Sequence, residues 1–409
     1  MQDNEKKPAL RFKGFTDPWE QRKFSELYEK VSRKNDLTYG KDDIISVANM
    51  YYKAESYITD ENYLLTYNVF EMGDIAFEGN KSKNFAHGRF VENTIGNGIV
   101  SHVFDVFKPR MTNYDLQFWK YAINNERIMG PILLRSTKAS TMMTNLVADD
   151  FLQENFLIPC YEEQKKIGEF LNQLDTLITL HQRKYEKLVN IKKSMLDKMF
   201  PQNGVSVPEI RFKGFTDPWE QRKLGEICDF ITKGATPTTY GFSWQPDGVP
   251  FFRNDSIKDN VFVFGEFSYI SEAANEVLKR SEVHGNDILI AITGDIGKVG
   301  IIPDTVEKAN INQHIARVRI RKEALPYFVY QYLASDDTQK EYQKIKTGLS
   351  MPQLSLEQVR DIVVKIPEFN EQGKIAGCLR RIDTLITLHQ RKLEKLQNIK
   401  KSCLEKMFV

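Results

Sequence analysis

Two kinds of motif in this chain contain residue types that catalysis uses, and each lacks a part that the chemistry requires. An aminomethyltransferase holds its target amine with an Asn/Asp-Pro-Pro-aromatic loop, but residues 17–19 and 217–219 (both Asp-Pro-Trp) are one proline short. Residues 294–300 approach a GxxxxGK[ST] phosphate-binding loop, but Val299 follows Lys298 where Ser or Thr is required. We therefore predict neither methyl transfer nor nucleotide binding here, and interpret the Asp-Pro-Trp segments as packed turns.

Metal-dependent chemistry is not indicated either. A nuclease of the metal-carboxylate type needs an acidic pair followed by Glu-x-Lys, and no such sequence follows Pro303-Asp304. The six histidines form no HExxH motif and the four cysteines form no CxxC pair, so we predict no zinc site and no disulfide framework. We interpret the chain as non-catalytic, with no metal and no cofactor of its own.

Binding chemistry is better represented. Side chains that read base edges are mostly Arg, Lys, Asn and Gln on loops, while Lys, Arg, Ser and Thr also contact phosphates. Several polar loops carry these types, although an ordinary solvated surface has the same composition. The candidate DNA-contact residues are Lys81, Lys83, Asn84, Arg89, Lys138, Lys233, Thr236, Arg253, Asn254, Lys298 and Lys346.

The overall charge says little about a partner, because 57 Lys and Arg against 55 Asp and Glu leave a net charge of +2. Residues 181–200 hold six basic and two acidic side chains, which we interpret as a solvated helix face in preference to direct phosphate contact. No run approaches the roughly 18 apolar residues of a membrane span, and the N-terminus lacks the apolar core of a signal peptide. We therefore expect a cytoplasmic protein.

Two repeats organise the chain. Residues 11–23 (RFKGFTDPWEQRK) recur unchanged at 211–223, and residues 175–200 recur at 383–408 with 22 of 26 positions identical. The stretches between them barely resemble each other, so two near-identical frames enclose two different domains. This pattern indicates two different recognition surfaces on one scaffold, and the alternative is a recent duplication followed by drift in unimportant domains.

The longer repeat reads as an amphipathic helix in both copies, because apolar residues recur at spacings of three and four. A helix over residues 162–200 would be on the order of 58 Å long, too long to lie across one small domain. So narrow a stripe is most simply buried against a partner helix with the same stripe. We interpret His181 and His389, which fall in the two stripes, as polar seam residues that fix the register of the helix pair, not as ligands. The predicted seam is Ile167, Leu171, Leu174, Ile178, His181, Tyr185 and Leu188 with Ile375, Leu379, Ile382, Ile386, His389, Leu393 and Leu396, and the same spacing continues through Ile191, Met195 and Met199 and through Ile399, Cys403 and Met407.

The repeats predict four segments. We expect a globular domain over residues 1–156, a long helix over 157–204, a second globular domain over 205–364 and a second long helix over 365–409. Short apolar runs bounded by glycines predict small antiparallel or mixed sheets, so the fold class is α/β (α+β) with an internal pseudo-two-fold repeat. The predicted strands are 43–47, 63–70, 74–77 and 98–107 with a helix at 116–124, and then 249–252, 261–264, 287–293, 299–302 and 315–320 with a helix at 326–334.

The two halves also share short motifs. Met72-Gly73-Asp74-Ile75 corresponds to Gly285-Asn286-Asp287-Ile288, and in both halves an Ile-Pro pair and a Glu-Gln pair precede a helix whose core reads Leu-Asp-Thr-Leu-Ile or Ile-Asp-Thr-Leu-Ile. The second half contains a Gly-x-Ser-x-Pro-Gln-Leu turn at 348–354, where the first half has Ser140 for the glycine and Thr144 for the proline. With these motifs the whole chain resembles the specificity (S) subunits of type I restriction-modification systems.

The resemblance implies a non-catalytic DNA reader. In such subunits each variable domain is a target-recognition domain for one half of a bipartite, gapped site, and the long helices pair as an antiparallel coiled coil that acts as a spacer. The implied partners are double-stranded DNA, two methyltransferase (M) subunits and, in the larger complex, restriction (R) subunits. S-adenosylmethionine, Mg²⁺ and ATP would serve those partners. The alternative function is a coiled-coil scaffold whose globular ends bind proteins and never touch DNA.

Overall fold

The computed structural model describes residues 6–53, 58, 60–139, 143–202, 204–265, 268–348 and 352–409. Contacts within the chain define two compact units: unit 1 comprises Met1–Gln182 and Gln390–Val409, and unit 2 comprises Arg183–His389. The long helices α5 (Tyr161–Met199) and α10 (Phe369–Lys406) are each divided between the units. Each unit therefore contains the first half of its own long helix and the last half of the other one.

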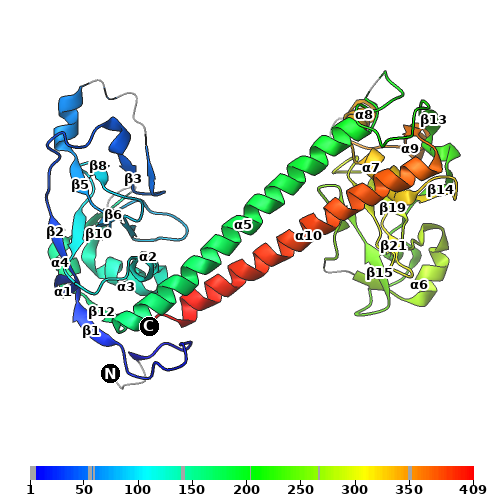
Figure 1. The fold of residues 1–409 in the computed structure, drawn as a ribbon. Helices are drawn as coiled ribbons and strands as arrows, with labels where there is room; N and C mark the ends of the chain where they lie inside the picture. Colours follow the sequence, from blue (N-terminus) through cyan, green and yellow to red (C-terminus); the bar gives the residue numbers. More distant parts are fainter. Residues whose placement is uncertain are drawn as a thin grey trace. The chain divides into compact units, whose positions relative to one another are not determined.

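Unit 1 is built on a four-stranded antiparallel sheet in the order β2-β9-β6-β7. A separate antiparallel pair, β1 with β12, joins the repeated motif of residues 11–23 to the start of α5 (Figure 1). Helices α2, α3 and α4 share one hydrophobic core with the sheet and with the start of α5. The elements are β1 (Glu20–Lys23), α1 (Phe24–Leu27), β2 (Tyr28–Val31), β3 (Ile45–Ser46), β4 (Tyr51–Tyr52), β5 (Asn68–Phe70), β6 (Ile75–Glu78), β7 (Arg89–Glu92), β8 (Gly98–Val100), β9 (Val106–Pro109), α2 (Leu116–Ala122), α3 (Glu126–Ser136), β10 (Thr137–Ala139), β11 (Thr144–Leu146), α4 (Ala148–Gln153) and β12 (Asn155–Ile158).

Unit 2 repeats this plan with a sheet in the order β14-β22-β19-β20 and a frame pair of β13 with β23. It adds a three-stranded sheet, β18-β15-β21, in which β15 and β21 run parallel. The elements are β13 (Glu220–Lys223), β14 (Cys228–Lys233), β15 (Val249–Phe252), β16 (Ile257–Lys258), β17 (Val261–Phe262), β18 (Ser268–Ile270), α6 (Glu272–Val277), β19 (Ile288–Ala291), β20 (Val299–Ile301), β21 (Asn310–Ile311), β22 (Ile315–Ile320), α7 (Pro326–Leu333), α8 (Asp336–Ile345), α9 (Leu356–Asp361) and β23 (Val363–Ile366).

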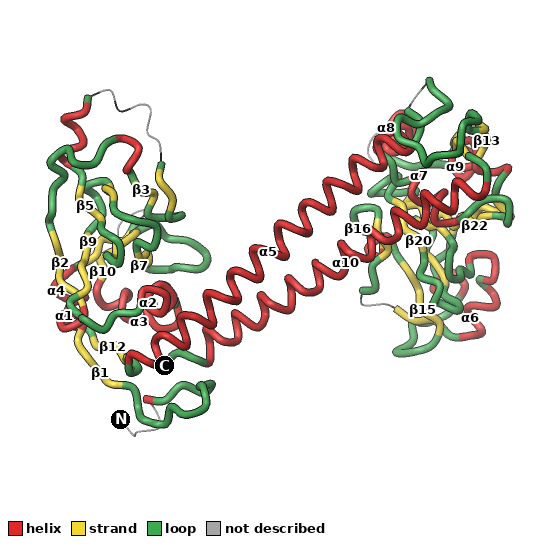
Figure 2. Tube along the Cα trace, viewed as in Figure 1, coloured by secondary structure: helices red, strands yellow, loops and turns green. Residues whose placement is uncertain are grey.

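The shared turn motif leads into an equivalent strand of the main sheet in both halves. Gly73 (φ 91°) and Asn286 (φ 71°) occupy the same left-handed position, which glycine and asparagine tolerate, directly before an Asp-Ile pair. The strands that follow, β6 and β19, are buried along their whole length. The predicted fold class, two α/β domains with small sheets, is confirmed, and Figure 2 shows that loops make up much of both units.

Two strand predictions are wrong. Of the strand predicted at 63–70, residues 63–66 belong instead to a 3₁₀ helix over 61–66, which Asp60 caps by accepting a hydrogen bond from the Asn62 amide at 2.9 Å. The run at 98–107 is two strands, β8 and β9, which pair with different partners, β5 for the first and β2 and β6 for the second. Of the seven-residue turn motif in the second half, residues 349–351 lie outside the described residues, as does Ser140 in the first half.

The predicted antiparallel pairing of the long helices is confirmed within each unit. In unit 1 the last turns of α10 lie beside the start of α5, where Cys403, Met407 and Phe408 join the core that contains Ile167 and Leu171 (Figure 1). In unit 2 the last turn of α5 does the same: Met199 and Phe200 enter the core that contains Ile375 and Leu379. The helix ends therefore complete the hydrophobic core of the other half's domain.

Burial along the apolar stripe is graded. Positions next to a globular core, such as Leu174 and Ile382, are buried, whereas the middle of the stripe is half-buried. Ile191 and Ile399 are 38% and 36% exposed, because a pair of helices covers only a narrow stripe and positions at its edge stay in water. The half-buried seam residues are Ile178, His181, Tyr185, Leu188, Ile386, His389, Leu393 and Leu396.

Candidate nucleic-acid interface

The ends of several strands meet at one end of unit 2. Because β15 and β21 run parallel, the residues that follow them lie side by side, and the Asn312 amide donates to the Phe252 carbonyl at 3.1 Å. The Ile292 amide, just after β19, donates to the His314 carbonyl at 2.9 Å. Gly234, just after β14, approaches the same turn so closely that an added Cβ would lie 1.9 Å from a β21 carbonyl oxygen. We call residues 233–236, 253–254, 293–298, 312–314 and the described residues of 346–353 the loop cluster of unit 2.

The loop cluster contains every DNA-contact residue that the sequence predicts for the second half. Asn254 is tied to the turn between β19 and β20, because its side-chain amide donates to the Thr293 carbonyl at 2.7 Å. The segment after α8 joins the same turn, since Gln353 forms bridges with both Thr293 and Thr347. Pairing between distant segments therefore gathers candidates that are more than 100 residues apart in sequence: Lys233, Thr236, Arg253, Asn254, Lys298 and Lys346.

Arg253 is held by two neutral side chains. Its guanidinium carbon lies 4.8 Å from the centre of the Trp244 ring, and its Nη2 donates to the hydroxyl of Ser268 at 2.7 Å. Among the residues that the structure describes, no carboxylate forms an ion pair with it. Arg253 thus presents a full positive charge that is held in place by neutral groups.

A chain of polar groups runs beside it. The Thr236 hydroxyl donates to the side-chain oxygen Oε1 of Gln313 at 2.6 Å, and the side-chain nitrogen Nε2 of Gln313 lies 3.1 Å from Nε2 of His314. These side chains are exposed or half-buried. Each keeps further hydrogen-bonding capacity toward solvent, which is the chemistry that reading a base edge requires.

Two of the three candidate lysines of the cluster, Lys298 and Lys346, border a cavity of about 330 Å³ lined by residues of the β19–β20 turn and of α8. The Lys298 ammonium donates to the Asp295 carboxylate at 2.8 Å, which raises the pKa of the lysine. The Lys346 ammonium donates to the neutral Gln343 side chain at 2.7 Å. Among the described residues Lys346 therefore has no acidic partner at this rim, whereas the charge of Lys298 is partly neutralised by Asp295.

Unit 1 has a related cluster at the β6–β7 turn. The Thr144 amide donates to the Gly79 carbonyl at 2.8 Å, and the Thr144 hydroxyl donates to the His87 carbonyl at 2.8 Å. These bonds hold the β10–β11 hairpin, which carries the exposed Lys138, against the turn. The turn itself carries the exposed candidates Lys81, Lys83 and Asn84.

Arg89 differs from the other candidates of unit 1. Its Nε donates to the Glu78 carboxylate at 2.7 Å, its Nη2 donates to the Ala48 carbonyl at 2.7 Å, and its guanidinium lies over the Phe85 ring. Two of its five N–H donors and one face of the guanidinium are therefore engaged within the domain. The geometry gives Arg89 a structural task, since it ties the start of β7 to the end of β6.

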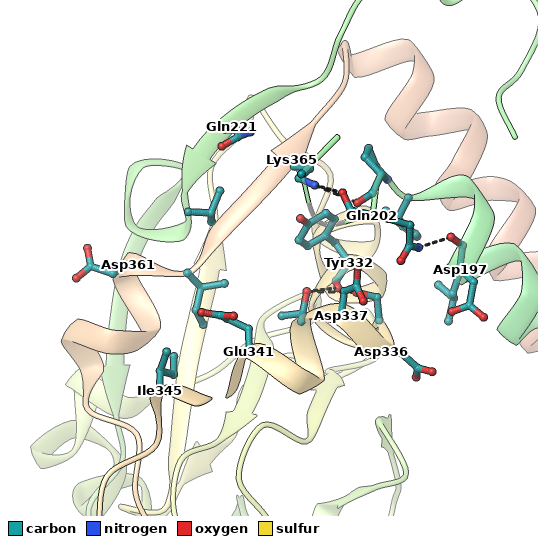
Figure 3. Close-up of a pocket in the computed structure, with 18 of the residues that line it drawn as sticks. Asp197, Gln202, Gln221, Tyr332, Asp336, Asp337, Glu341, Ile345, Asp361 and Lys365 are labelled. Carbon is teal, nitrogen blue, oxygen red and sulfur yellow. Dashed lines mark hydrogen bonds between the residues drawn. The ribbon is translucent and has the colours of Figure 1, made fainter. Parts of the chain in front are cut away.

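A larger cavity, of about 550 Å³, lies elsewhere in unit 2, between the last turn of α5, the start of α8 and β23 (Figure 3). Lys365 extends into its wall, where its ammonium donates to the Gln202 carbonyl at 2.6 Å and burial lowers its pKa. Acidic side chains at the rim already pair with lysines: Asp336 with Lys193 at 3.6 Å, Asp337 with Lys340 at 3.5 Å and Asp361 with Lys223 at 2.7 Å. None of the candidate DNA-contact residues lines this cavity.

Within the described ranges, no group of three or more His, Cys, Asp or Glu side chains is placed to hold a metal ion. The same ranges contain no helix that is both long enough and apolar enough to cross a membrane. Some lysines of the long helices take part in ion pairs, such as Lys192 with Asp383 at 2.8 Å.

Sequence reasoning missed four polar or aromatic residues at the interface. Trp244 and Ser268 hold Arg253, and Gln313 and His314 extend the polar chain. An exposed tryptophan within a polar stretch (GFSWQPDG) is a signal that could have identified Trp244. Gln313 and His314 separate the apolar runs of β21 and β22. From the sequence this position predicts a turn, but it does not predict that the turn belongs to the loop cluster.

The sequence matches one family over most of its length. A profile described as "Type I restriction modification DNA specificity domain" matches residues 16–190 and again residues 216–398. The putative type I restriction enzyme MjaX specificity subunit of Methanocaldococcus jannaschii is 28% identical over 254 residues, which cover 60% of this chain and 56% of that protein. The EcoBI specificity subunit of Escherichia coli is 24% identical over 321 residues, or 72% of this chain and 65% of that protein. The matched region thus spans less than two thirds of the length of these relatives.

Solved structures show the same fold over nearly the whole chain. The crystal structure of the S subunit of a type I restriction-modification system from M. genitalium superposes with a TM-score of 0.59 at 16% identity, covering 98% of this chain and 99% of that one. A chain from a structural study of complex assembly and conformational transition of the type I R-M system gives a TM-score of 0.50 at 15% identity, covering 95% and 97%. At these identities the similarity concerns the fold alone.

Proposed function

This chain belongs to the type I restriction-modification DNA specificity family, and from that premise we propose that it reads a bipartite, gapped DNA site, one half with each unit. The chain itself is the recognition subunit and supplies no catalytic group. Two M subunits, and R subunits in a larger complex, would act on the DNA that it selects. Those partners would use S-adenosylmethionine, Mg²⁺ and ATP, and an assembly that acts on genomic DNA would be cytoplasmic.

The proposal rests on a contrast within the chain: the repeated segments and main sheets of the two units are alike, whereas the loops at the sheet ends carry different side chains. Both units have the same strand order in the main sheet and an identical motif at residues 11–23 and 211–223. The loop clusters at the sheet ends carry different candidate side chains, with Lys83, Asn84 and Lys138 in one and Arg253, Asn254 and Gln313 in the other. A common scaffold with different cation- and amide-bearing loops suits two different half-sites of one polyanion.

The test is binding and methylation of a pool of random duplexes by the chain together with an M subunit. We expect selection of a split motif, with an affinity that falls steeply as salt rises because phosphate contacts release counterions. Binding that is absent, or that does not change with salt, would favour the alternative of a protein-binding coiled-coil scaffold.

An exchange experiment tests the division of labour between the units. Replacing residues 24–156 with the corresponding stretch of a relative should change one half of the selected motif and leave the other half intact. The exchange keeps the frame motif at 11–23 and both long helices, so the fold of unit 2 serves as its internal control. A change in both halves, or in neither, would contradict the proposal of one unit per half-site.

A further inference from the structure

The loop cluster of unit 2 holds one arginine in an unusual setting. Other arginines of this unit pair with carboxylates of the fold: Arg319 pairs with Asp287 at 2.7 Å, and Arg211 pairs with Glu371 at 2.7 Å. Arg253 instead rests on an exposed aromatic ring, that of Trp244, and no acidic partner occurs among the described residues. A cation that is ordered without being neutralised is available to a ligand.

We propose that Arg253 reads a guanine base in the half-site bound by unit 2, and that Trp244 and Ser268 position it for that contact. This inference rests on the proposed DNA-reading function and deepens it, because it assigns one base and one residue. The ligand class is the major-groove edge of a G·C pair, which presents the O6 and N7 acceptors.

The backbone beneath Arg253 is fixed from several sides. Arg253 directly follows Phe252, whose carbonyl accepts the Asn312 amide at 3.1 Å, so the end of β15 is tied to the neighbouring turn. On its other side Asn254 is bonded to the Thr293 carbonyl at 2.7 Å. Arg253 itself is extended (φ −126°, ψ −179°), so its side chain leaves a braced strand end and not a loose loop.

The side chain is braced as well. The Trp244 ring, 4.8 Å from the guanidinium carbon, supports one face of the planar group, and the Ser268 hydroxyl accepts one N–H at 2.7 Å. A guanidinium has five N–H donors, so about four remain for a ligand. A planar fork held in this way suits two parallel hydrogen bonds to the O6 and N7 of guanine, whereas a phosphate contact needs only a mobile charge.

The experiment uses the full chain assembled with its M subunit and a pool of duplexes randomised one position at a time around the site that the wild-type complex selects. Methylation of each duplex is counted by sequencing. We expect Arg253→Gln to lower discrimination at one G·C pair by roughly 5- to 150-fold, with the other half-site unchanged. Arg253→Lys should lose the same discrimination, because it keeps the charge and lacks the fork.

Two further variants test the role of the ring. Trp244→Ala should weaken discrimination at the same base pair, while Trp244→Phe, which keeps an aromatic face, should restore most of it. The matched control is Arg321→Gln, because Arg321 is also exposed but follows β22 at the end opposite the loop cluster, where its Nε lies 3.6 Å from Asp229. This control should leave every position of the motif unchanged.

The outcomes distinguish failure of the role proposed for Arg253 from failure of the proposed DNA-reading function. If Arg253→Gln keeps the base preferences of the wild type, Arg253 does not read a base. If Arg253→Lys keeps full discrimination at the G·C pair, a point charge on a phosphate is enough, and the proposed role of Arg253 is also wrong. If Arg253→Gln fails to assemble, Arg253→Lys and Trp244→Ala decide the question. If the wild-type complex selects no sequence at all, the proposed function itself fails.

Discussion

The ammonium of Lys400 on α10 lies 2.5 Å from a carboxylate oxygen of Asp175 on α5. The equivalent pair with the helices exchanged, Lys192 on α5 with Asp383 on α10, is 2.8 Å long. Tyrosine hydroxyls from the two globular domains donate to the same carboxylates, Tyr121 to Asp175 at 2.7 Å and Tyr327 to Asp383 at 2.5 Å. One aspartate in each copy of the repeat therefore joins both long helices to a domain.

The first prediction concerns this ion pair. Asp175→Asn keeps an acceptor for Tyr121 but leaves the partly buried Lys400 without its counter-charge, so we expect the end of α10 to be destabilised by about 1–2 kcal/mol. Hydrogen exchange of residues 390–406 measures this change. Lys193→Ala, which removes an exposed ion pair of 3.6 Å with Asp336, is the control and should change stability by less than about 0.5 kcal/mol. Equal effects of the two variants would contradict the prediction.

The second prediction concerns the end of α10. Phe408 is 3% exposed and lies against Trp19 and Phe118 with ring centres 6.3 and 5.6 Å away, so Phe408→Ala should destabilise unit 1 by about 3–5 kcal/mol. Ile399→Ala, on the same helix but 36% exposed, should cost less than about 1 kcal/mol. Thermal unfolding of the two variants compares them. A small effect of Phe408→Ala would mean that this helix end is not part of the core.

The third prediction concerns thiol reactivity. Burial raises the pKa of the Cys228 thiol to about 12 and also raises the pKa of Cys403, while Cys160 is exposed. A raised pKa lowers the thiolate fraction at any given pH, so at pH 8 iodoacetamide should label Cys160 first and leave Cys228 and Cys403 protected. Mass spectrometry of the labelled peptides measures the order, and urea should make all sites react. Early labelling of Cys403 in the native protein would show that the end of α10 is undocked.

The fourth prediction concerns the approach of two loops. Gly234→Ala would place a Cβ 1.9 Å from the Ile311 oxygen and 2.3 Å from the Asn312 oxygen, both backbone atoms that yield only if a loop shifts. We expect this variant to lose selection of the half-site read by unit 2 and to keep the other half. Gly377→Ala, on α10 with open space around it, should instead stabilise unit 2 by up to about 1 kcal/mol. Unchanged selection by Gly234→Ala would argue against the loop cluster as the reading surface.

The fifth prediction concerns helix length. Four residues inserted after Leu180 would lengthen α5 by about 6 Å and rotate its remainder by about 40°. The spacing between Asp175 and Lys192 on α5 would then no longer match the spacing between Asp383 and Lys400 on α10, so the two ion pairs could not form together. Matched insertions after Leu180 and Leu388 keep both pairs. We expect the single insertion to abolish methylation and the matched pair to restore it on a site whose gap is longer by about one or two base pairs. Restored activity on the original gap would exclude the helices as the spacer.

The sequence by itself determined the elements whose signals are local. The three-four spacing of apolar residues predicted both long helices, and the apolar runs that begin with Asp-Ile at 74–77 and 287–293 predicted a strand in each half. Identity between the two copies of the frame predicted the repeated architecture. Such features follow from steric preferences and periodicity, which act over a few residues and are therefore readable without knowledge of the fold.

Only the tertiary structure decided what each polar residue does. Arg89 and Arg253 both lie in polar stretches of the sequence and looked alike there. In the structure the register of β6 with β7 sets Glu78 opposite Arg89, whereas Arg253 contacts the neutral Trp244 and Ser268. Likewise, the apolar stripe predicted that Met199 and Met407 are buried but not that each completes the core of the other half's domain. The reason is that periodicity specifies which face of an element leaves water, while the partner of that face depends on pairing between segments far apart in the chain.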